Sequence, residues 1–194
     1  VVLLLASFLL GLSGCGRFFV PESGGGDGGT GVPPRFAYVA NFAGGFAGTI
    51  SAFTVDPTSG TLTEVTGSPF VASLGPDSVA TDANGRFLYV ANQGGGVSGY
   101  VIDRSSGTLT AITGSPFTAG TSPVAVAVTP GGRFVYVVNN NSDDVSIFSV
   151  DQTSGALTSA GSFTVAASPL AATVDPGGRF LYVRNAGGFV GAFR

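Results

Sequence analysis

The fold is decided by a seven-residue stretch, Arg-Phe-Val-Tyr-Val-Val-Asn at Arg133–Asn139, because this pattern occurs four times in the chain. The other copies begin at Arg35, Arg86 and Arg179, which places the Arg positions 51, 47 and 46 residues apart. A repeat period of about 40–50 residues is typical of chains built from one small structural unit. We therefore expect a single unit to recur from residue 35 to the end of the sequence.

Each unit contains four runs rich in Val, Phe, Tyr, Ile and Thr, bounded by Gly, Pro, Asp or Ser, as in short strands joined by turns. In the third copy these runs are 124–128, 134–138, 145–150 and 156–160. Apolar residues point to both faces of these strands, so both faces must be covered. Stacked propeller blades provide that cover. The expected fold class is all-β: a β-propeller of four-stranded antiparallel blades, with about three and a half blades present of an expected seven.

The turns of the unit have a physical basis in their residue types. Two turns, Asp-Pro-Gly-Gly at 175–178 and Thr-Pro-Gly-Gly at 129–132, place Pro at the second position and Gly where φ is positive. Three further acidic residues precede a Ser-Gly pair, namely Asp56, Asp103 and Asp151. We expect these carboxylates to accept hydrogen bonds from their own turn backbone, in preference to a catalytic or metal-binding role.

The N-terminal region has the composition of an export signal. Residues 1–10 are almost entirely apolar but fewer than the roughly 20 needed to span a bilayer. They lead into Leu-Ser-Gly-Cys at 12–15, which matches a bacterial lipobox, so Cys15 is the expected lipidation site and the expected anchor to a membrane. The alternative is a buried strand with an incidental Cys. Because Gly16 is not the Asp associated with inner-membrane retention, the expected location is the outer membrane.

The chain is therefore expected to have three parts. Residues 1–15 form the lipoprotein signal, residues 16–34 form a flexible tether rich in Gly and Pro, and residues 35–194 form a partial propeller. The first copy of the unit begins at its second strand, so the inner strand of that blade must come from elsewhere. We expect the sequence to be cut at both ends, with the fourth copy incomplete.

The repeat resembles a known family. The pattern Asp-Pro-x-Gly-Arg-Phe-Leu-Tyr-Val-x-Asn at 175–185, with Ser-Gly-Thr-Leu-Thr at 106–110 and Gly-Ser-Pro-Phe at 114–117, is similar to the lactonase-type seven-bladed propellers. That family includes 6-phosphogluconolactonase-like proteins and adjoins surface proteins named for Tyr-Val-Thr-Asn repeats. The resemblance covers 35–194 and implies the fold. It does not imply the activity, because the matching residues are turn and core positions.

Composition excludes several functions. The chain has no His, and its Glu residues are Glu22, in the expected tether, and Glu64. A Ser-His-Asp triad, an imidazole base and a His-ligated metal are therefore not available, and we expect no cofactor and no metal. The eight basic residues are scattered Arg residues and the net charge is −3, so we expect no nucleic-acid partner. Catalytic residues remain unassigned.

Six polar residues are candidate ligand-binding groups. One of them replaces a small apolar residue of the other copies and can bind a carboxylate or another anion. Three are the amides that close the repeated pattern, and two are acidic residues of a polar loop that can face a ligand. For each, a structural interpretation is favoured: an exposed Arg, turn-forming amides and a solvated hairpin tip. The six are Arg184, Asn92, Asn139, Asn185, Asp143 and Asp144.

Two functions from different classes remain open. One is a non-catalytic propeller at the cell envelope that binds a small lactone, a carbohydrate or a protein partner. The other is a lactone hydrolase whose key residues lie mostly in blades that this sequence does not contain. Export and the lack of a basic cluster argue against a phosphorylated substrate. A neutral or carboxylated lactone is the better match.

Overall fold

A computed structural model describes residues 18–19, 35–42 and 47–194, and in these ranges every regular element is a β-strand. The predicted signal at 1–15, the lipidation site Cys15 and most of the predicted tether lie outside the described residues. Among the residues described, no helix is long and apolar enough to cross a bilayer. The prediction of an all-β chain is confirmed.

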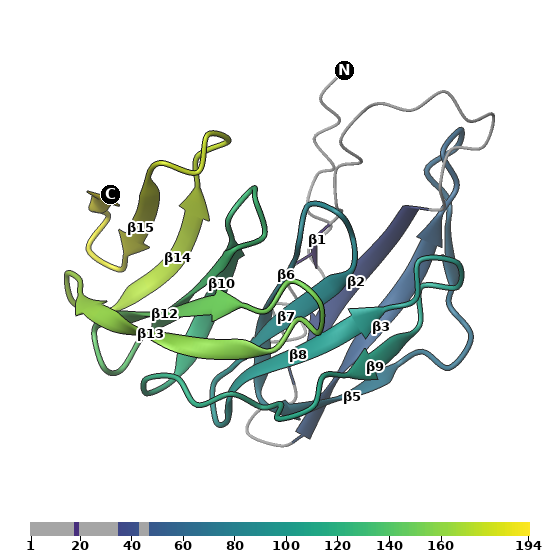
Figure 1. Ribbon diagram of the computed structural model, residues 1–194, viewed down its shortest axis with the longest axis horizontal. Coiled ribbons are helices and arrows are strands. Elements are labelled where there is room, and N and C mark those ends of the chain that lie inside the picture. The colour runs from purple at the N-terminus through teal and green to yellow at the C-terminus, as the bar shows by residue number, and fades with distance from the viewer. Residues whose placement is uncertain (1–17, 20–34, 43–46) are drawn as a thin grey trace.

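The strands form four antiparallel sheets that follow one another in the chain, and we name them blades 1 to 4 (Figure 1). Blade 1 contains β1 (Phe18–Phe19), β2 (Arg35–Asn41), β3 (Ala47–Val55) and β4 (Leu62–Glu64), and β5 (Phe70–Leu74) also pairs with β3. Blade 2 contains β6 (Pro76–Thr81), β7 (Phe87–Asn92), β8 (Gly96–Ile102) and β9 (Leu109–Ala111). Blade 3 contains β10 (Pro123–Val128), β11 (Phe134–Asn139), β12 (Asp144–Val150) and β13 (Leu157–Thr164). Blade 4 contains β14 (Pro169–Val174), β15 (Leu181–Asn185) and β16 (Val190–Phe193).

The inner position of blade 1 is taken by a short strand from the N-terminal side. In β1, Phe18 pairs with Val39 and Phe19 with Tyr38 of β2. This pairing satisfies part of the backbone edge that β2 would otherwise leave open. The two residues fall within the segment 16–34, for which the sequence predicted a flexible tether, and the rest of that segment lies outside the described residues. Strand β1 is thus an inner partner of β2, and the sequence analysis expected such a partner to come from elsewhere in the chain.

The core lies between blades, as the two-sided apolar pattern predicted. We call the face that a blade turns toward the following blade its front face, and the opposite face its rear face. Tyr38 and Ala40 on the front of blade 1 share one apolar cluster with Leu88 and Val90 on the rear of blade 2. The same alternation joins blade 2 to blade 3 and blade 3 to blade 4. Successive blades therefore bury each other's apolar faces.

The turns behave as their residue types predicted. The Oδ1 atom of Asp56 accepts hydrogen bonds from the backbone N–H groups of Thr58, at 2.9 Å, and Ser59, at 2.7 Å. Asp103 and Asp151 make the equivalent bonds. In the Thr129-Pro-Gly-Gly turn, the glycine with positive φ is Gly132, at 65°. The prediction that these Asp residues bond to their own turns is confirmed.

Neighbouring blades are also joined by a contact that we call the Tyr–Gly latch. The hydroxyl of Tyr38 in blade 1 donates a hydrogen bond of 2.9 Å to the carbonyl oxygen of Gly107, in the turn that precedes the outer strand of blade 2. Gly107 has a φ of 77°, and a Cβ added there would collide with the ring of Phe36. The latch thus consists of a Phe and a Tyr on one front face and a glycine turn on the next blade.

Candidate functional site

Two of the predicted amides are buried at the ends of the second strands of blades 2 and 3. Asn92 donates from Nδ2 to the hydroxyl of Ser98, at 3.0 Å, and to the backbone carbonyl of Val90, at 3.1 Å. Asn139 donates from Nδ2 to the hydroxyl of Ser146 and to Oδ1 of Asp144, both at 2.9 Å. Both amides are fully buried, and their Oδ1 atoms have no hydrogen-bond partner among the described residues. The hydrogen bonds that the two amides donate fix the conformation of the loop that follows the strand in each blade.

The third amide and the two acidic residues also bond within the fold. Asn185 accepts a hydrogen bond of 3.0 Å at Oδ1 from the backbone N–H of Phe189. Asp143 accepts one of 2.7 Å from the N–H of Ser168, which ties the β11–β12 loop to the connection between blades 3 and 4. Asp144 bonds Asn139, as described above. The structure brings Asn139 and Asp144 together, whereas Asn92 and Asn185 lie in separate blades.

Arg184 occupies an unusual place in the repeat. It is exposed, lies on the front face of blade 4, and pairs in register with Ala171 and Val190. The structure shows no hydrogen bond or ion pair between its guanidinium and another described residue. The equivalent residues of the other blades are fully buried between blades; they are Ala40, Ala91 and Val138. Arg184 therefore places a cation on a face that is apolar in blades 1 to 3.

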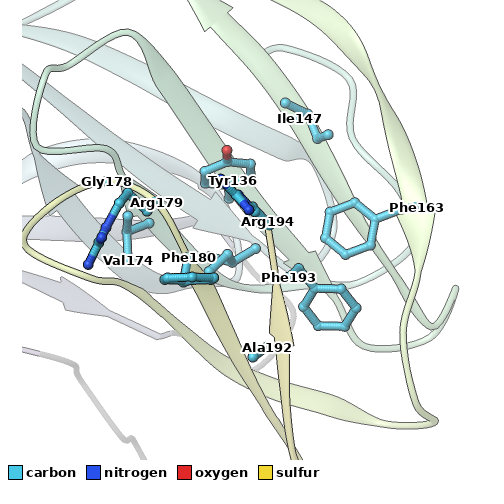
Figure 2. A pocket seen from close by; sticks show the side chains of 11 residues that line it. Tyr136, Ile147, Phe163, Val174, Gly178, Arg179, Phe180, Ala192, Phe193 and Arg194 are labelled. Atoms are coloured by element: carbon cyan, nitrogen blue, oxygen red, sulfur yellow. The ribbon is translucent and has the colours of Figure 1, made fainter.

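Two cavities lie among the described residues, at the contacts between blades, and none of the six predicted residues lines either of them. The larger, about 590 Å³, lies between blades 3 and 4 (Figure 2). The rings of Phe163 and Phe193 lie at one side of it with their centroids 4.8 Å apart, Arg179 lies at the other side, and Tyr136 lies between them. Its lining includes Arg179 and Arg194 and no carboxylate.

The larger cavity is explained by the architecture. Between blades 2 and 3, the front face of blade 2 is covered by Leu157 of the outer strand β13 and by the glycine turn before it. Among the described residues blade 4 has three strands, β14 to β16, so a smaller part of the front face of blade 3 is covered there. The cavity is therefore an open part of the apolar contact between blades.

The smaller cavity is a groove of about 460 Å³ between the β7–β8 loop and the segment that leads from blade 2 into blade 3. The loop contributes Gln93 and the three glycines 94–96. The connecting segment contributes Thr118, Thr121 and Ser122. The groove therefore offers three hydroxyl groups and the amide of Gln93, whose Nε2 also donates to Oδ2 of Asp77 at 3.2 Å, and no titratable side chain lines it. This set matches neutral, hydroxyl-rich ligands.

The sequence analysis did not single out this groove. Its residues come from a loop and from an interblade connection that are distant in sequence and have no repeated motif. The available signal was the run of three glycines after Asn92, which allows a close approach to the backbone. The hydroxyl groups 118–122 gave no signal of their own, since Ser and Thr are common in loops.

Comparison with known proteins supports the propeller fold that the sequence repeat predicted. Residues 33–116 and 78–174 match the model of the family described as lactonase, seven-bladed β-propeller. The chain belongs to the lactonase-type seven-bladed β-propellers. No curated protein matches it.

Solved structures of propeller proteins share the fold of this chain. The periplasmic gluconolactonase of Pseudomonas aeruginosa is 30% identical, with a TM-score of 0.57, over 70% of this chain and 38% of that one. A candidate 6-phosphogluconolactonase from Bacteroides fragilis is 27% identical, with a TM-score of 0.60, over 70% and 37%. One from Bacteroides uniformis is 20% identical, with a TM-score of 0.67, over 82% and 50%, and shows the fold alone. The chain thus spans half the length of these structures or less.

The ionisable groups with notable surroundings lie in turns or are buried between blades. Asp82 is almost fully buried, forms an ion pair of 3.3 Å with Arg86, and accepts hydrogen bonds from two backbone N–H groups. Backbone hydrogen bonds, the largest from Phe180, hold the pKa of Asp175 below its usual value. Burial raises the pKa of Tyr38, Tyr89 and Tyr100. These groups serve the fold.

Hydrolytic chemistry has little support in the described part of the chain. No cluster of three or more His, Cys, Asp or Glu side chains there is arranged to hold a metal ion. General acid–base catalysis needs a titratable group within hydrogen-bond reach of the reacting atoms. The polar groove has none, and the larger cavity offers guanidinium groups and the phenol of Tyr136.

Proposed function

We propose that this chain provides the ligand-binding blades of an envelope lactonase-type propeller, and that the ligand is a neutral or carboxylated lactone or the sugar acid related to it. The observation that carries the proposal is the groove between blades 2 and 3, whose uncharged lining combines an amide and three hydroxyl groups with four glycines, two prolines and an alanine. Hydroxyl and amide groups can exchange hydrogen bonds with a polyol.

The uncharged lining of the groove favours ligands without a phosphate group. Phosphate recognition relies on Arg, Lys or a set of converging backbone N–H groups. No Arg lines this groove. A phosphorylated sugar is therefore a poorer ligand than its non-phosphorylated counterpart. Attachment to the membrane through a lipid on Cys15, with outer-membrane location, is part of the same proposal and agrees with a non-phosphorylated, extracytoplasmic ligand.

Calorimetric titration of the full-length protein tests the proposal with a matched pair of ligands, gluconate and 6-phosphogluconate. Gluconate is expected to bind more tightly, and Thr118→Val, which removes a groove hydroxyl while keeping its size, should weaken it. Thr110→Val removes an exposed strand hydroxyl outside the groove and is the control. Tighter binding of the phosphorylated ligand, or equal effects of the two variants, would refute the groove assignment.

Lactone hydrolysis is the second candidate, favoured by the 30% identity to a protein described as a periplasmic gluconolactonase. On this hypothesis the groups that activate water lie outside the described residues. Titration of acid release from glucono-δ-lactone by the full-length protein, compared with the spontaneous rate, measures it directly. Lipidation is measured separately, by incorporation of labelled palmitate into the wild-type chain and its absence in Cys15→Ser.

A further inference from the structure

One wall of the groove between blades 2 and 3 is held by the β11–β12 loop of blade 3. This wall is the segment 120–122 of the lining, and we call it the groove wall. The carbonyl oxygen of Thr121 accepts a hydrogen bond of 3.1 Å from the backbone N–H of Asn141, and that of Ser122 accepts one of 2.9 Å from Asn140. Blade 2 makes the equivalent backbone bonds before its own inner strand, so these two bonds belong to the repeat.

Two further hydrogen bonds to the groove wall come from side chains. The hydroxyl oxygen of Ser142 accepts a hydrogen bond of 2.9 Å from the N–H of Thr121. The hydroxyl oxygen of Ser146 accepts one of 3.2 Å from the N–H of Gly120. The contact is also close, because a Cβ added at Gly120 would lie 2.6 Å from the hydroxyl oxygen of Ser142. The two serine side chains therefore set where the groove wall lies.

The carboxylate of Asp144 orients the Ser142 hydroxyl. Its Oδ1 atom accepts hydrogen bonds from the hydroxyl of Ser142, at 2.6 Å, and from Nδ2 of Asn139, at 2.9 Å. A hydroxyl has one proton, so when Ser142 donates it to Asp144 its lone pairs are left to accept from Thr121. Asn139 also donates to Ser146. A continuous network thus runs from the buried amide, through Asp144 and the two serines, to the backbone of the groove wall.

Asp144 is not a requirement of the repeat. The strand register pairs Asn139 with Asp144 in blade 3, whereas the corresponding residue is Gly96 in blade 2 and Thr49 in blade 1. Among these three blades, a carboxylate therefore holds the loop in blade 3 alone. Blade 3 is also the blade whose loop supports the groove wall, and both blades that form the groove have all four strands.

We propose that Asp144 is a positioning residue of the ligand-binding groove. Through Ser142 it fixes the backbone of Thr121, and with it the hydroxyl groups of Thr121 and Ser122 that line the groove. Neither of these hydroxyls has a hydrogen-bond partner among the described residues, so both can bond to a polyol. Groups that are ordered before binding lose less freedom when the ligand arrives, which strengthens binding. The inference rests on the proposed function and assigns to the same site a residue that does not touch the ligand.

Calorimetric titration of the full-length protein with gluconate tests the proposal through Ser142→Ala. Ser142 is exposed and does not line the groove, so its truncation releases the groove wall with little effect on the unfolding temperature. The dissociation constant for gluconate should rise about threefold to tenfold, as expected for the loss of one hydrogen bond. Asn141→Ala is the matched control, because Asn141 is an exposed neighbour in the same loop whose side chain makes no hydrogen bond among the described residues.

Substitutions of two adjacent carboxylates separate positioning from the loss of a charge. Asp144→Ala should weaken gluconate binding as Ser142→Ala does. Asp144→Asn should restore it, because the amide oxygen still accepts from the Ser142 hydroxyl although the charge is lost. Asp143 accepts a hydrogen bond of 2.7 Å from the N–H of Ser168, in the connection between blades 3 and 4. Asp143→Ala should therefore bind gluconate no more weakly than the wild type.

The outcomes distinguish this inference from the proposed function. If the wild type does not bind gluconate, the proposed function fails and the inference fails with it. If the wild type binds and Ser142→Ala and Asp144→Ala bind equally well, the positioning role is wrong and the groove assignment stands. Equal weakening in Asn141→Ala or Asp143→Ala, or no rescue in Asp144→Asn, would also overturn the inference, because the loop would then act through its general fold.

Discussion

The hydroxyl of Tyr89 donates a hydrogen bond of 2.8 Å to the carbonyl oxygen of Gly155, across the interface between blades 2 and 3. Tyr89 is fully buried, and burial raises its pKa, so the phenol remains a donor throughout the physiological pH range. The Gly155 carbonyl belongs to the turn before the outer strand of the next blade. One hydrogen bond thus fixes the outer part of blade 3 against the middle of blade 2.

Tyr89→Phe tests the contribution of this hydrogen bond to stability. The substitution keeps the ring in the core but leaves a buried carbonyl without its partner, which costs about 1–3 kcal/mol. Urea unfolding should therefore show a lower midpoint with an unchanged slope. Tyr136→Phe is the matched control, because the Tyr136 hydroxyl has no partner among the described residues, and its loss should change stability by less than about 0.5 kcal/mol. Equal losses in the two variants would contradict the latch.

Gly155→Ala tests the packing half of the same contact. The added Cβ would lie 2.5 Å from the ring of Phe87, and the φ of 75° is itself unfavourable for alanine. Gly85→Ala carries the same kind of backbone strain with no atom within 4 Å of the Cβ. We expect both to be destabilised by about 1 kcal/mol from the backbone, and Gly155→Ala by a further 1–3 kcal/mol from overpacking. Thermal unfolding of the pair isolates the steric part.

The repeat explains why the fold was predictable from the sequence. Four copies of one pattern, with both faces of the strands apolar, left stacked blades as the natural architecture, and the strand bounds around 124–150 agree closely with β10, β11 and β12. The Tyr–Gly latch was not predicted. Its residues were visible as repeats, yet their contact depends on how one blade packs on the next, which no local pattern specifies.

The site was less predictable, for a physical reason. Asn92 and Asn139 look the same in sequence whether they bind a ligand or hold a turn, and their burial is a property of tertiary packing. The groove is formed by neutral loop residues from two segments, and neutral residues leave no charge pattern to detect. Arg184 was detectable because it departs from the repeat, and the structure places it on the front face of blade 4.

The carboxylates of three turns make the free energy of unfolding depend on pH. Hydrogen bonds from Ser59, Ser105 and Ser154 hold the pKa of Asp56, Asp103 and Asp151, respectively, below the ordinary value of 3.8. Below about pH 4 the unfolded chain therefore binds protons that the folded chain does not, so stability falls as pH falls through the folded pKa values. Above the unfolded pKa this contribution is fully present and does not vary.

The triple variant with Asn at 56, 103 and 151 checks this sign. Asn keeps an acceptor oxygen for the turn but does not titrate in this range. Urea midpoints measured from pH 7 to pH 2.5 should decline less steeply in the variant than in the wild type. Circular dichroism at pH 7 verifies that the turns are intact. A steeper decline in the variant, or the same slope, would mean that these carboxylates do not control the acid response.

Asn139→Ala separates the structural interpretation of the repeated amides from a ligand-binding one. The Asn139 amide is fully buried and donates to the hydroxyl of Ser146 and to the half-buried carboxylate of Asp144, so its removal loses two hydrogen bonds and should cost about 1–3 kcal/mol. Asn141→Ala, an exposed neighbour in the same loop, should cost less than about 0.5 kcal/mol. The opposite outcome is that both variants unfold at the wild-type midpoint and Asn139→Ala alone loses binding of gluconate. Asn139 is then a ligand-binding group, because a side chain needed for folding cannot be removed without a loss of stability.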